Sequence, residues 1–276
     1  MSSQTFRFKQ FSIRQEMSAM KVGTDGVLLG AWCGKDLYVT EAAPDGSPLR
    51  RAFCPQHILD IGTGTGLIAL MAAQRFPEAR VTGIDIDASA IEEARLNVGR
   101  SPFAGRTAVC HLSFQDFLHS HDTLSEEMCD FQPASSAVCP TLFDLIVSNP
   151  PFYDQSLENP DPQRSLARHT SALPFVELIE GAFRLLASHG IFCVILPTEV
   201  YKSFCTEASI AGFHLMRHTA VKTVARKQPR RHLLAFAKTP SLFDTSDAMI
   251  HEEHCLSDAS GNRSEWYHGI TNDFYL

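Results

Sequence analysis

The stretch from Phe143 to Tyr153 holds the residue types best suited to chemistry. It begins as an apolar run typical of a buried strand and then stops at Asn149-Pro150-Pro151-Phe152. Neither proline can donate to a sheet ladder, so the strand ends with an amide, a stiff carbonyl and an aromatic ring. The Asn149 oxygen and a nearby main-chain carbonyl can each accept one hydrogen of an amino group, while Phe152 stacks on a planar substrate. An ordinary strand-end turn would fit the tetrapeptide equally well.

A turn with three glycines lies upstream, between a predicted strand and a predicted helix. Gly62, Gly64 and Gly66 permit a tight turn and let backbone N–H groups approach a ligand closely. The next predicted strand ends at Asp85, about where a carboxylate that binds ribose hydroxyls is expected. This order of strand, turn, helix, strand and acid indicates a ligand that contains adenosine.

Asp60, at the end of the first strand, separates two possible cofactors. An acid just before the glycine turn would repel the pyrophosphate of NAD, but it would tolerate a sulfonium or an amino group. S-adenosylmethionine carries both groups. We therefore expect S-adenosylmethionine as the cofactor, with NAD as the alternative.

Two further groups of polar residues are candidates for cofactor binding. Asp116 follows the third predicted strand and could receive an adenine amino group, although it could equally be a loop acid or a helix cap. Thr24 or Asp25 is predicted to cap a helix, and with Lys21 they crowd its N-terminus, where backbone N–H groups favour an anion. A plain capped helix is the alternative there.

The predicted strands share one feature: their candidate residues all follow the carboxyl end. In open α/β sheets ligands bind off these ends, so the glycine turn, Asp85, Asp116 and Asn149 should converge on one crevice. The sequence predicts an α/β, doubly wound, Rossmann-like fold with a mostly parallel sheet and a C-terminal antiparallel hairpin near 213–221 and 232–237. A helix over 173–186 is expected to end in a C-cap at 187–190.

Between Glu207 and Asp244 the chain has cations and no acid, although its net charge is -7. This local asymmetry suits a phosphate backbone, and a solvated hairpin tip is the alternative. The cations of this stretch are Arg217, Lys222, Arg226, Lys227, Arg230, Arg231 and Lys238.

The remaining composition indicates a cytoplasmic protein. The eight cysteines form no Cys-x-x-Cys pair, which favours reduced thiols over disulfides or a zinc site. The N-terminal residues lack the features of a signal peptide, and no apolar run is long enough to span a membrane. We expect neither a membrane nor a metal as partner.

Taken together, the motifs resemble class I S-adenosylmethionine-dependent methyltransferases and, more narrowly, the tRNA1(Val) (adenine(37)-N6)-methyltransferase family. The resemblance covers nearly the whole chain. Its specific parts are the Met-Lys-Val-Gly-Thr-Asp-Gly block at 20–26 and the Pro-Gln-Arg loop at 162–164; the glycine motif and Asn-Pro-Pro alone fit many methyltransferases. The sequence departs from the family in having Phe152 where Tyr is frequent, and in longer segments near 34–55 and 119–140.

The resemblance implies a single methyltransferase domain over 1–276, with an N-terminal arm and helix over 1–33 and a Rossmann-like core over 58–276. It implies methyl transfer from S-adenosylmethionine to the exocyclic N6 of adenine 37, beside the anticodon of a valine tRNA, by a protein expected to be a monomer. The residues assigned to the substrate amino group are Asn149, Pro150, Pro151 and Phe152. The residues assigned to the cofactor are Lys21, Thr24, Asp25, Asp60, Gly62, Gly64, Gly66, Asp85, Asp116 and Asn149.

The cations assigned to RNA are Arg164, Arg168, Lys222, Arg226, Lys227, Arg230 and Arg231. Two alternatives keep the enzyme class and change the acceptor to guanine N2 of rRNA or to a glutamine of a release factor. A third is a nucleotide-binding or scaffold protein without turnover, which the intact Asn149-to-Phe152 motif disfavours.

Overall fold

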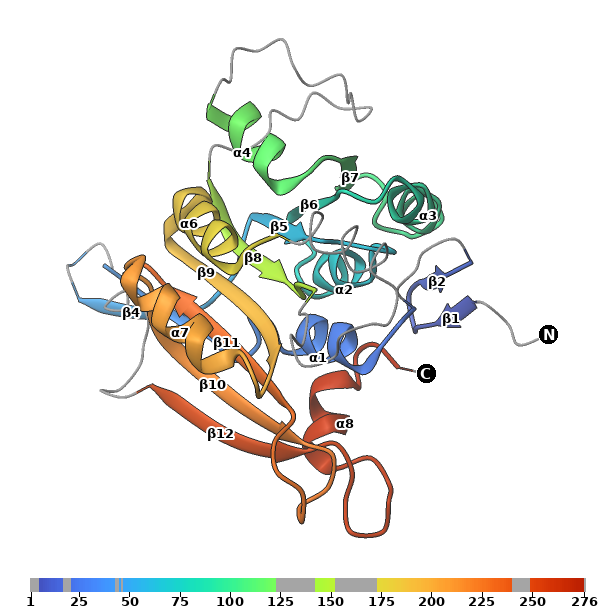
Figure 1. Ribbon diagram of the computed structural model, residues 1–276, viewed down its shortest axis with the longest axis vertical. Coiled ribbons are helices and arrows are strands. Elements are labelled where there is room, and N and C mark those ends of the chain that lie inside the picture. Colours follow the sequence, from blue (N-terminus) through green and yellow to red (C-terminus); the bar gives the residue numbers. More distant parts are fainter. Residues whose placement is uncertain are drawn as a thin grey trace, which may run out of the picture.

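An eight-stranded sheet forms the centre of the protein, with the order β12-β10-β11-β9-β8-β5-β6-β7 (Figure 1). The computed structural model describes residues 5–16, 21–42, 45, 47–122, 142–151, 173–239 and 249–275. The strands of this sheet are β5 (His57–Ile61), β6 (Arg80–Asp85), β7 (Thr107–His111), β8 (Phe143–Ser148), β9 (Leu186–Pro197), β10 (His214–Lys222), β11 (Arg231–Ala237) and β12 (Ile250–Cys255).

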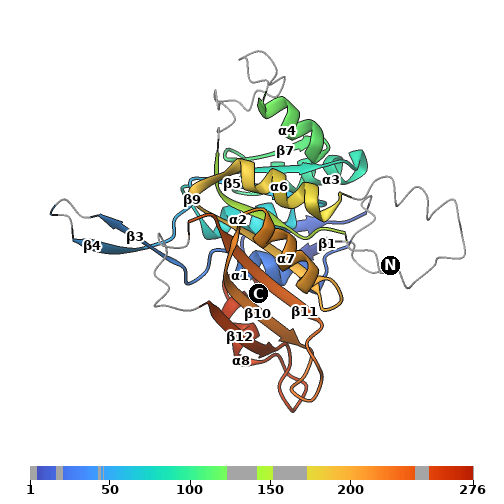
Figure 2. The ribbon, with the colours of Figure 1, turned by 60° about the vertical axis from the view of Figure 1, so that its left-hand side comes forward.

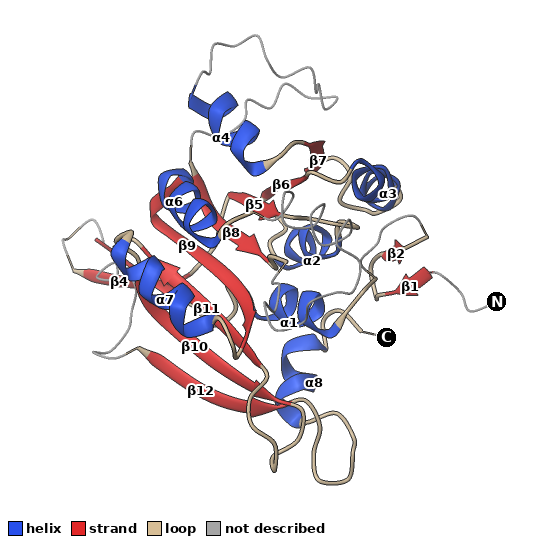
Figure 3. Ribbon diagram, viewed as in Figure 1, coloured by secondary structure: helices blue, strands red, loops and turns tan. Residues whose placement is uncertain are grey.

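Helices cover both faces of the sheet because its central strands are apolar on both sides (Figure 3). In β8, Leu145 and Val147 belong to one core cluster, while Phe143 and Ile146 belong to the other. Helices α1 (Thr24–Trp32), α2 (Leu67–Arg75), α3 (Ala88–Gly99) and α8 (Glu265–Thr271) pack on the first face. Helices α4 (Phe114–Asp122), α6 (Phe175–Leu185) and α7 (Tyr201–Ile210) pack on the second.

The strand directions confirm the predicted fold class. Strands β7, β6, β5, β8 and β9 are parallel, whereas β11 runs antiparallel to both β9 and β10. The chain adds β6 and β7 on one side of β5, then places β8 and β9 on the other side. The topology therefore reverses between β5 and β8, the position at which doubly wound sheets bind ligands.

Two small hairpins lie outside the main sheet. The N-terminal arm is a pair of short antiparallel strands, β1 (Thr5–Arg7) and β2 (Ser12–Arg14). Within the segment 34–55, strands β3 (Tyr38–Ala42) and β4 (Pro48–Ala52) form a separate antiparallel pair that projects from the molecule (Figure 2). The other long segment lies largely outside the described residues, with α4 reaching Asp122.

Two local predictions about the elements were wrong or incomplete. Helix α6 does not end in a C-cap at 187–190: Leu186 is already extended, and β9 begins there. Gly190 lies within β9, where a Cβ atom would come within 2.9 Å of the Phe143 carbonyl oxygen and nearer still to Leu186. The glycine therefore serves close packing instead of ending a helix. Strand β12, a polar edge strand, was not predicted.

No helix in the described residues is long and apolar enough to cross a membrane. In the same part of the chain, no group of three or more His, Cys, Asp or Glu side chains is placed to hold a metal ion.

Candidate active site

The carboxyl ends of β5 and β8 lie side by side at the reversal point of the sheet. Ile61 pairs with Ser148, and the Ser148 hydroxyl donates a hydrogen bond to the Ile61 carbonyl oxygen at 2.9 Å. Gly62 and Asn149 are the next residues on the two strands. The sheet therefore brings the glycine turn and the Asn-Pro-Pro motif together, as the sequence predicts.

The glycine turn has the backbone conformation that its composition predicts. Gly62, Gly64 and Gly66 have φ values of +73°, +55° and +82°, a backbone region that residues other than glycine rarely adopt. A Cβ atom at Gly62 or Gly64 would meet nothing within 4 Å. The turn thus leaves open space beside its backbone, which suits the close approach of a bound cofactor.

Asp60 lies beneath this turn and is fully buried. Its Oδ2 atom accepts hydrogen bonds from the Thr63 hydroxyl at 2.6 Å and from the Ala69 N–H at 3.0 Å. Its Oδ1 atom has no hydrogen-bond partner within the described part of the chain. Burial raises the pKa of the Asp60 carboxyl to about 7, against the opposing effect of these hydrogen bonds. An unpaired carboxylate oxygen behind the turn suits a nearby positive charge.

Asp85 lies at the end of β6 and contacts the glycine turn directly. Its Oδ2 atom accepts a hydrogen bond from Gly64 N–H at 2.8 Å, and its Oδ1 atom accepts one from Asp87 N–H at 2.9 Å. Burial raises the pKa of Asp85, while these two hydrogen bonds lower it. Each carboxylate oxygen has a second lone pair, so the side chain keeps the capacity to accept ribose hydroxyls.

Asp116 is not the cap of helix α4, because Ser113 accepts from its backbone N–H. It lies in the first turn of α4, where its Oδ2 atom accepts from the Ser113 hydroxyl at 2.6 Å and its N–H donates to Ser113 Oγ at 3.0 Å. Ser113 therefore caps the helix, and the Asp116 carboxylate orients the capping hydroxyl. The second oxygen of the exposed carboxylate remains the atom for the predicted adenine contact.

Helix α1 begins at Thr24, but neither Thr24 nor Asp25 caps it. The cap residue is Gly23, which offers no side chain. Asp25 instead forms an ion pair with the Arg231 guanidinium, and the Lys21 ammonium donates to the Gln15 carbonyl oxygen. The N-terminus of α1 is therefore linked to the start of β11 rather than capped.

The Asn149 carboxamide is half-buried and makes no hydrogen bond with the described residues. Pro150 beside it is buried and Pro151 is exposed, so the motif passes from the sheet to the surface at this point. Phe152, Arg164 and Arg168 lie outside the described residues.

The basic stretch divides into paired and exposed cations. Lys222 pairs with Glu253 of β12 and Arg231 with Asp25. Acids from distant segments engage both side chains, and the binding of RNA by these two cations stays a prediction. The cations left exposed in the loop between β10 and β11 are Arg226, Lys227 and Arg230.

Some supporting residues carry no motif and were not predicted. The buried Asn97 of α3 donates to the carbonyl oxygens of Thr65 in the glycine turn (2.9 Å) and Arg14 in β2 (3.0 Å), and it accepts from Arg14 N–H (2.9 Å). One side chain therefore joins the turn to the N-terminal arm. A lone polar residue in an amphipathic helix does not reveal such a role in the sequence.

Comparison with known proteins agrees with this geometry. A family model described as a methyltransferase domain matches residues 55–238. A Porphyromonas gingivalis protein named tRNA1(Val) (adenine(37)-N6)-methyltransferase is 42% identical over 278 residues, covering 100% of this chain and 96% of the relative. A Phocaeicola vulgatus protein of the same name is 41% identical, covering 98% and 97% of the two chains.

The chain belongs to this methyltransferase family. The crystal structure of a predicted O-methyltransferase, Atu636 from Agrobacterium tumefaciens, supports the fold, with a TM-score of 0.56 at 16% identity over 91% of this chain and 96% of that one. Membership in the tRNA1(Val) (adenine(37)-N6)-methyltransferase family confirms the predicted enzyme class and its cofactor, S-adenosylmethionine. NAD, the alternative cofactor, is not favoured.

Proposed function

We propose that this protein transfers a methyl group from S-adenosylmethionine to N6 of adenine 37 in valine tRNA. The observation that carries the proposal is the placement of Asn149 next to the open glycine turn, at the reversal point of the sheet. The names of the full-length relatives support the acceptor, and rRNA or a release factor is not favoured.

The residues around the glycine turn fit the cofactor. The open space beside Gly62 and Gly64 would admit its methionyl part, and the unpaired oxygen of Asp60 would favour its ammonium group. Asp85 would accept from the ribose hydroxyls, and Asp116 from the adenine amino group. We also assign Lys21, Thr24 and Asp25 to the rim of this site. When bound, S-adenosylmethionine supplies an electrophilic methyl group on a positively charged sulfur.

Asn149 is proposed to orient the substrate base. Its side-chain oxygen and the Pro150 carbonyl would accept the two hydrogens of N6, which aims the nitrogen lone pair out of the hydrogen-bonding plane. Phe152 would stack on an adenine that has left its helical stack. The chain then acts mainly by positioning, and no dedicated base is required because the N6 proton becomes acidic after methylation.

The exposed cations Arg226, Lys227 and Arg230 would bind tRNA phosphates near this edge of the sheet. We assign Arg164 and Arg168 to the same role from their family resemblance alone.

A monomer in the cytoplasm is also proposed; the free cysteines of the described residues suit a reducing compartment.

The test is transfer of labelled methyl from S-adenosylmethionine to unmodified tRNA, with nucleoside analysis of valine tRNA. Asn149→Ala should lower the single-turnover rate about 100-fold or more, because precisely placed hydrogen-bonding groups contribute about that much to catalysis. Cofactor affinity, measured by calorimetry, should change much less. Label in rRNA or a release factor, and none in tRNA, would contradict the proposed acceptor.

A further inference from the structure

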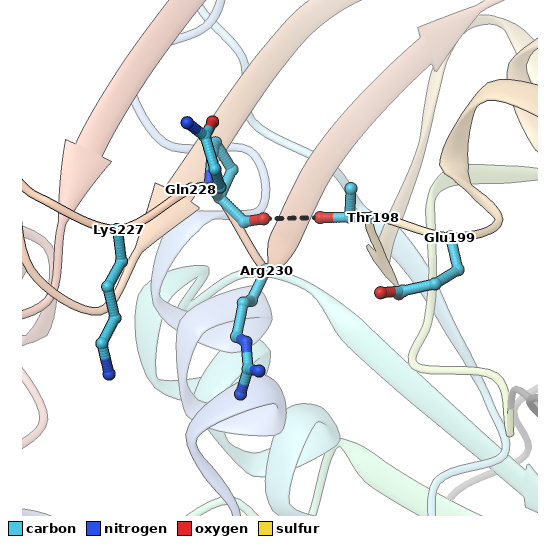
Figure 4. A pocket seen from close by; sticks show the side chains of 6 residues that line it. Thr198, Glu199, Lys227, Gln228 and Arg230 are labelled. Atoms are coloured by element: carbon cyan, nitrogen blue, oxygen red, sulfur yellow. Dashed lines mark hydrogen bonds between the residues drawn. The ribbon is translucent and has the colours of Figure 1, made fainter.

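A surface pocket of about 440 Å³ lies between the end of β9 and the loop that joins β10 to β11 (Figure 4). Its polar lining comes from two segments. Thr198 and Glu199 follow β9, while Lys227, Gln228 and Arg230 belong to the loop. The pocket therefore combines an acceptor, an amide and two cations, a mixture suited to a nucleotide: its base offers donors and its phosphate is an anion.

The charged side chains at this pocket are free to bind a ligand, as far as the described residues show. Glu199, Lys227 and Arg230 are exposed and form no ion pair with the described residues. The cations on the strands beside them are paired: Arg217 with Glu252 at 3.0 Å, and Lys222 with Glu253. In Figure 4 the Glu199 side chain reaches from the turn after β9 toward Arg230 without meeting it. The carboxylate thus remains available to accept hydrogen bonds from a ligand.

The two walls of the pocket are held together by a continuous hydrogen-bond chain. The Thr198 hydroxyl donates to the Pro229 carbonyl oxygen at 2.7 Å, and it lies 3.1 Å from Nε2 of His232. Because the Thr198 hydroxyl donates its one proton to the Pro229 carbonyl oxygen, His232 Nε2 must be the donor to Thr198. His232 Nδ1 is then an acceptor, which lies 2.8 Å from Nε2 of His218.

The same reasoning assigns the donor and acceptor nitrogens of the other histidines in this series of hydrogen bonds. His218 donates from Nε2, so its Nδ1 accepts from Nδ1 of His251 at 3.1 Å. Tyr201 stacks on the His232 ring, with centroids 3.7 Å apart. Burial, with the neighbouring histidines, lowers the pKa of His232 to about 4, so the ring stays neutral near pH 7. The walls are therefore pre-organised before any ligand binds.

The pocket is close to the proposed methylation site. Ser148, which precedes Asn149, pairs with Val194, and the pocket begins four residues after Val194 at Thr198. At about 3.3 Å per residue and about 4.8 Å between strands, Thr198 lies roughly 11 Å from Asn149. One or two nucleotides of an unstacked strand span this distance. A nucleotide next to the target adenine can therefore reach the pocket.

We propose that this pocket binds the nucleotide that precedes the target adenine and reads its base through Glu199. The inference rests on the proposed function. Valine codons begin with guanine, so the nucleotide before adenine 37 is a cytosine, whose N4 amino group donates hydrogen bonds. Glu199 accepts from that amino group, and Lys227 and Arg230 bind the adjoining phosphates. A uracil presents a carbonyl oxygen instead, which the carboxylate repels.

The test compares two transcripts of the valine tRNA, with cytosine or uridine before adenine 37, by kcat/KM for methyl transfer. The unmodified protein should prefer cytosine by roughly 5- to 100-fold. Glu199→Gln should reduce this preference to within about twofold or invert it, because an amide can also donate to the uracil oxygen. Glu207→Gln, an equal charge change on the exposed face of α7, should retain the preference.

A second variant separates base reading from phosphate binding. Arg230→Ala should lower kcat/KM for both transcripts by similar factors. If Glu199→Gln keeps the preference of the unmodified protein, or if that protein accepts both transcripts equally, the base-reading role is wrong. If the unmodified protein methylates neither transcript, the proposed function itself fails.

Discussion

At the scale of single residues, Asp60 shows how burial gives an acidic side chain a structural role that its sequence motif does not reveal. The sequence placed this carboxylate beside the cofactor, and the structure places it beneath the glycine turn, where one oxygen holds Thr63 and the N-terminal turn of α2. The other oxygen has no partner among the described residues. We infer that Asp60 both fixes the turn and favours positive charge near it.

This arrangement predicts that cofactor affinity depends on pH. The pKa of Asp60 is raised to about 7 in the free protein, so the carboxyl is largely protonated below pH 7. A bound cation favours the ionised form, so binding below pH 7 must release a proton. The Kd for S-adenosylhomocysteine should therefore fall as pH rises from 6 to 7.5, by at most about tenfold per unit.

Isothermal titration calorimetry in buffers of different ionisation enthalpy would measure both the affinity and the proton release. Asp60→Asn keeps a side-chain oxygen for Thr63 and Ala69 but cannot ionise. Its Kd should be higher near pH 7.5 and nearly independent of pH. A pH slope that persists in this variant would assign the effect to another group, such as Asp85.

Residue types at strand ends were predictable from sequence, while their partners were not. Gly62, Gly64 and Asp85 meet as expected, because the carboxyl ends of parallel strands share one edge. The acids that neutralise Lys222 and Arg231 come from segments far away in the chain. No local pattern indicates which cation such an acid will reach.

At the scale of elements, the same distinction explains the errors. The buried strands and the helices between them follow from apolar periodicity, which local sequence carries. Strand β12 is polar and pairs only because β10 offers a free edge, and its register is a long-range property. Gly190 resembles a helix end in sequence, but the side chain of Leu186 and the backbone of Phe143 decide its role.

The ion pair between Asp25 and Arg231 joins the first turn of α1 to the start of β11. Both side chains are 27% exposed, so solvent screens the pair only in part. A double-mutant cycle with Asp25→Ala and Arg231→Ala should give a coupling of about 1 kcal/mol in the free energy of unfolding, measured with urea. Each single variant should weaken cofactor binding, and the double variant should weaken it no more than either single variant does.

The control cycle uses Arg14 and Glu16, an ion pair whose side chains are 38% and 48% exposed. Its coupling should be close to zero, because exposed pairs contribute little. If the two cycles give the same coupling, the link between α1 and β11 has no special energetic role.

At the scale of the whole molecule, a net charge of -7 must be reconciled with a polyanionic substrate. The balance is local: three exposed cations lie in one loop near the carboxyl edge of the sheet, while acids of β12 neutralise cations behind them. Binding should therefore depend on a small number of phosphate contacts.

Replacement of Arg226, Lys227 and Arg230 by alanine should weaken tRNA binding and reduce its salt dependence. Each lost contact should lower the slope of log K against log salt by about 0.7 to 1, so the triple variant should lose about 2 to 3 units. Filter binding between 50 and 200 mM salt would measure this. Arg80→Ala, an exposed cation where β6 begins, at the opposite edge, should leave the slope unchanged; an equal loss there would mean a diffuse charge effect.

The N-terminal arm also contacts a segment far away in the chain, residues 272–275. Lys9 donates to the carbonyl oxygens of Asn272 and Phe274, and Phe8 stacks on the ring of Tyr275. Lys9 and Asn272 are 263 residues apart. A ribosome that adds 5–20 residues per second needs roughly 15–50 s to cover that interval. The arm can therefore dock on Asn97 and Phe103 first, and its contacts with residues 272–275 form only once that segment has been synthesised.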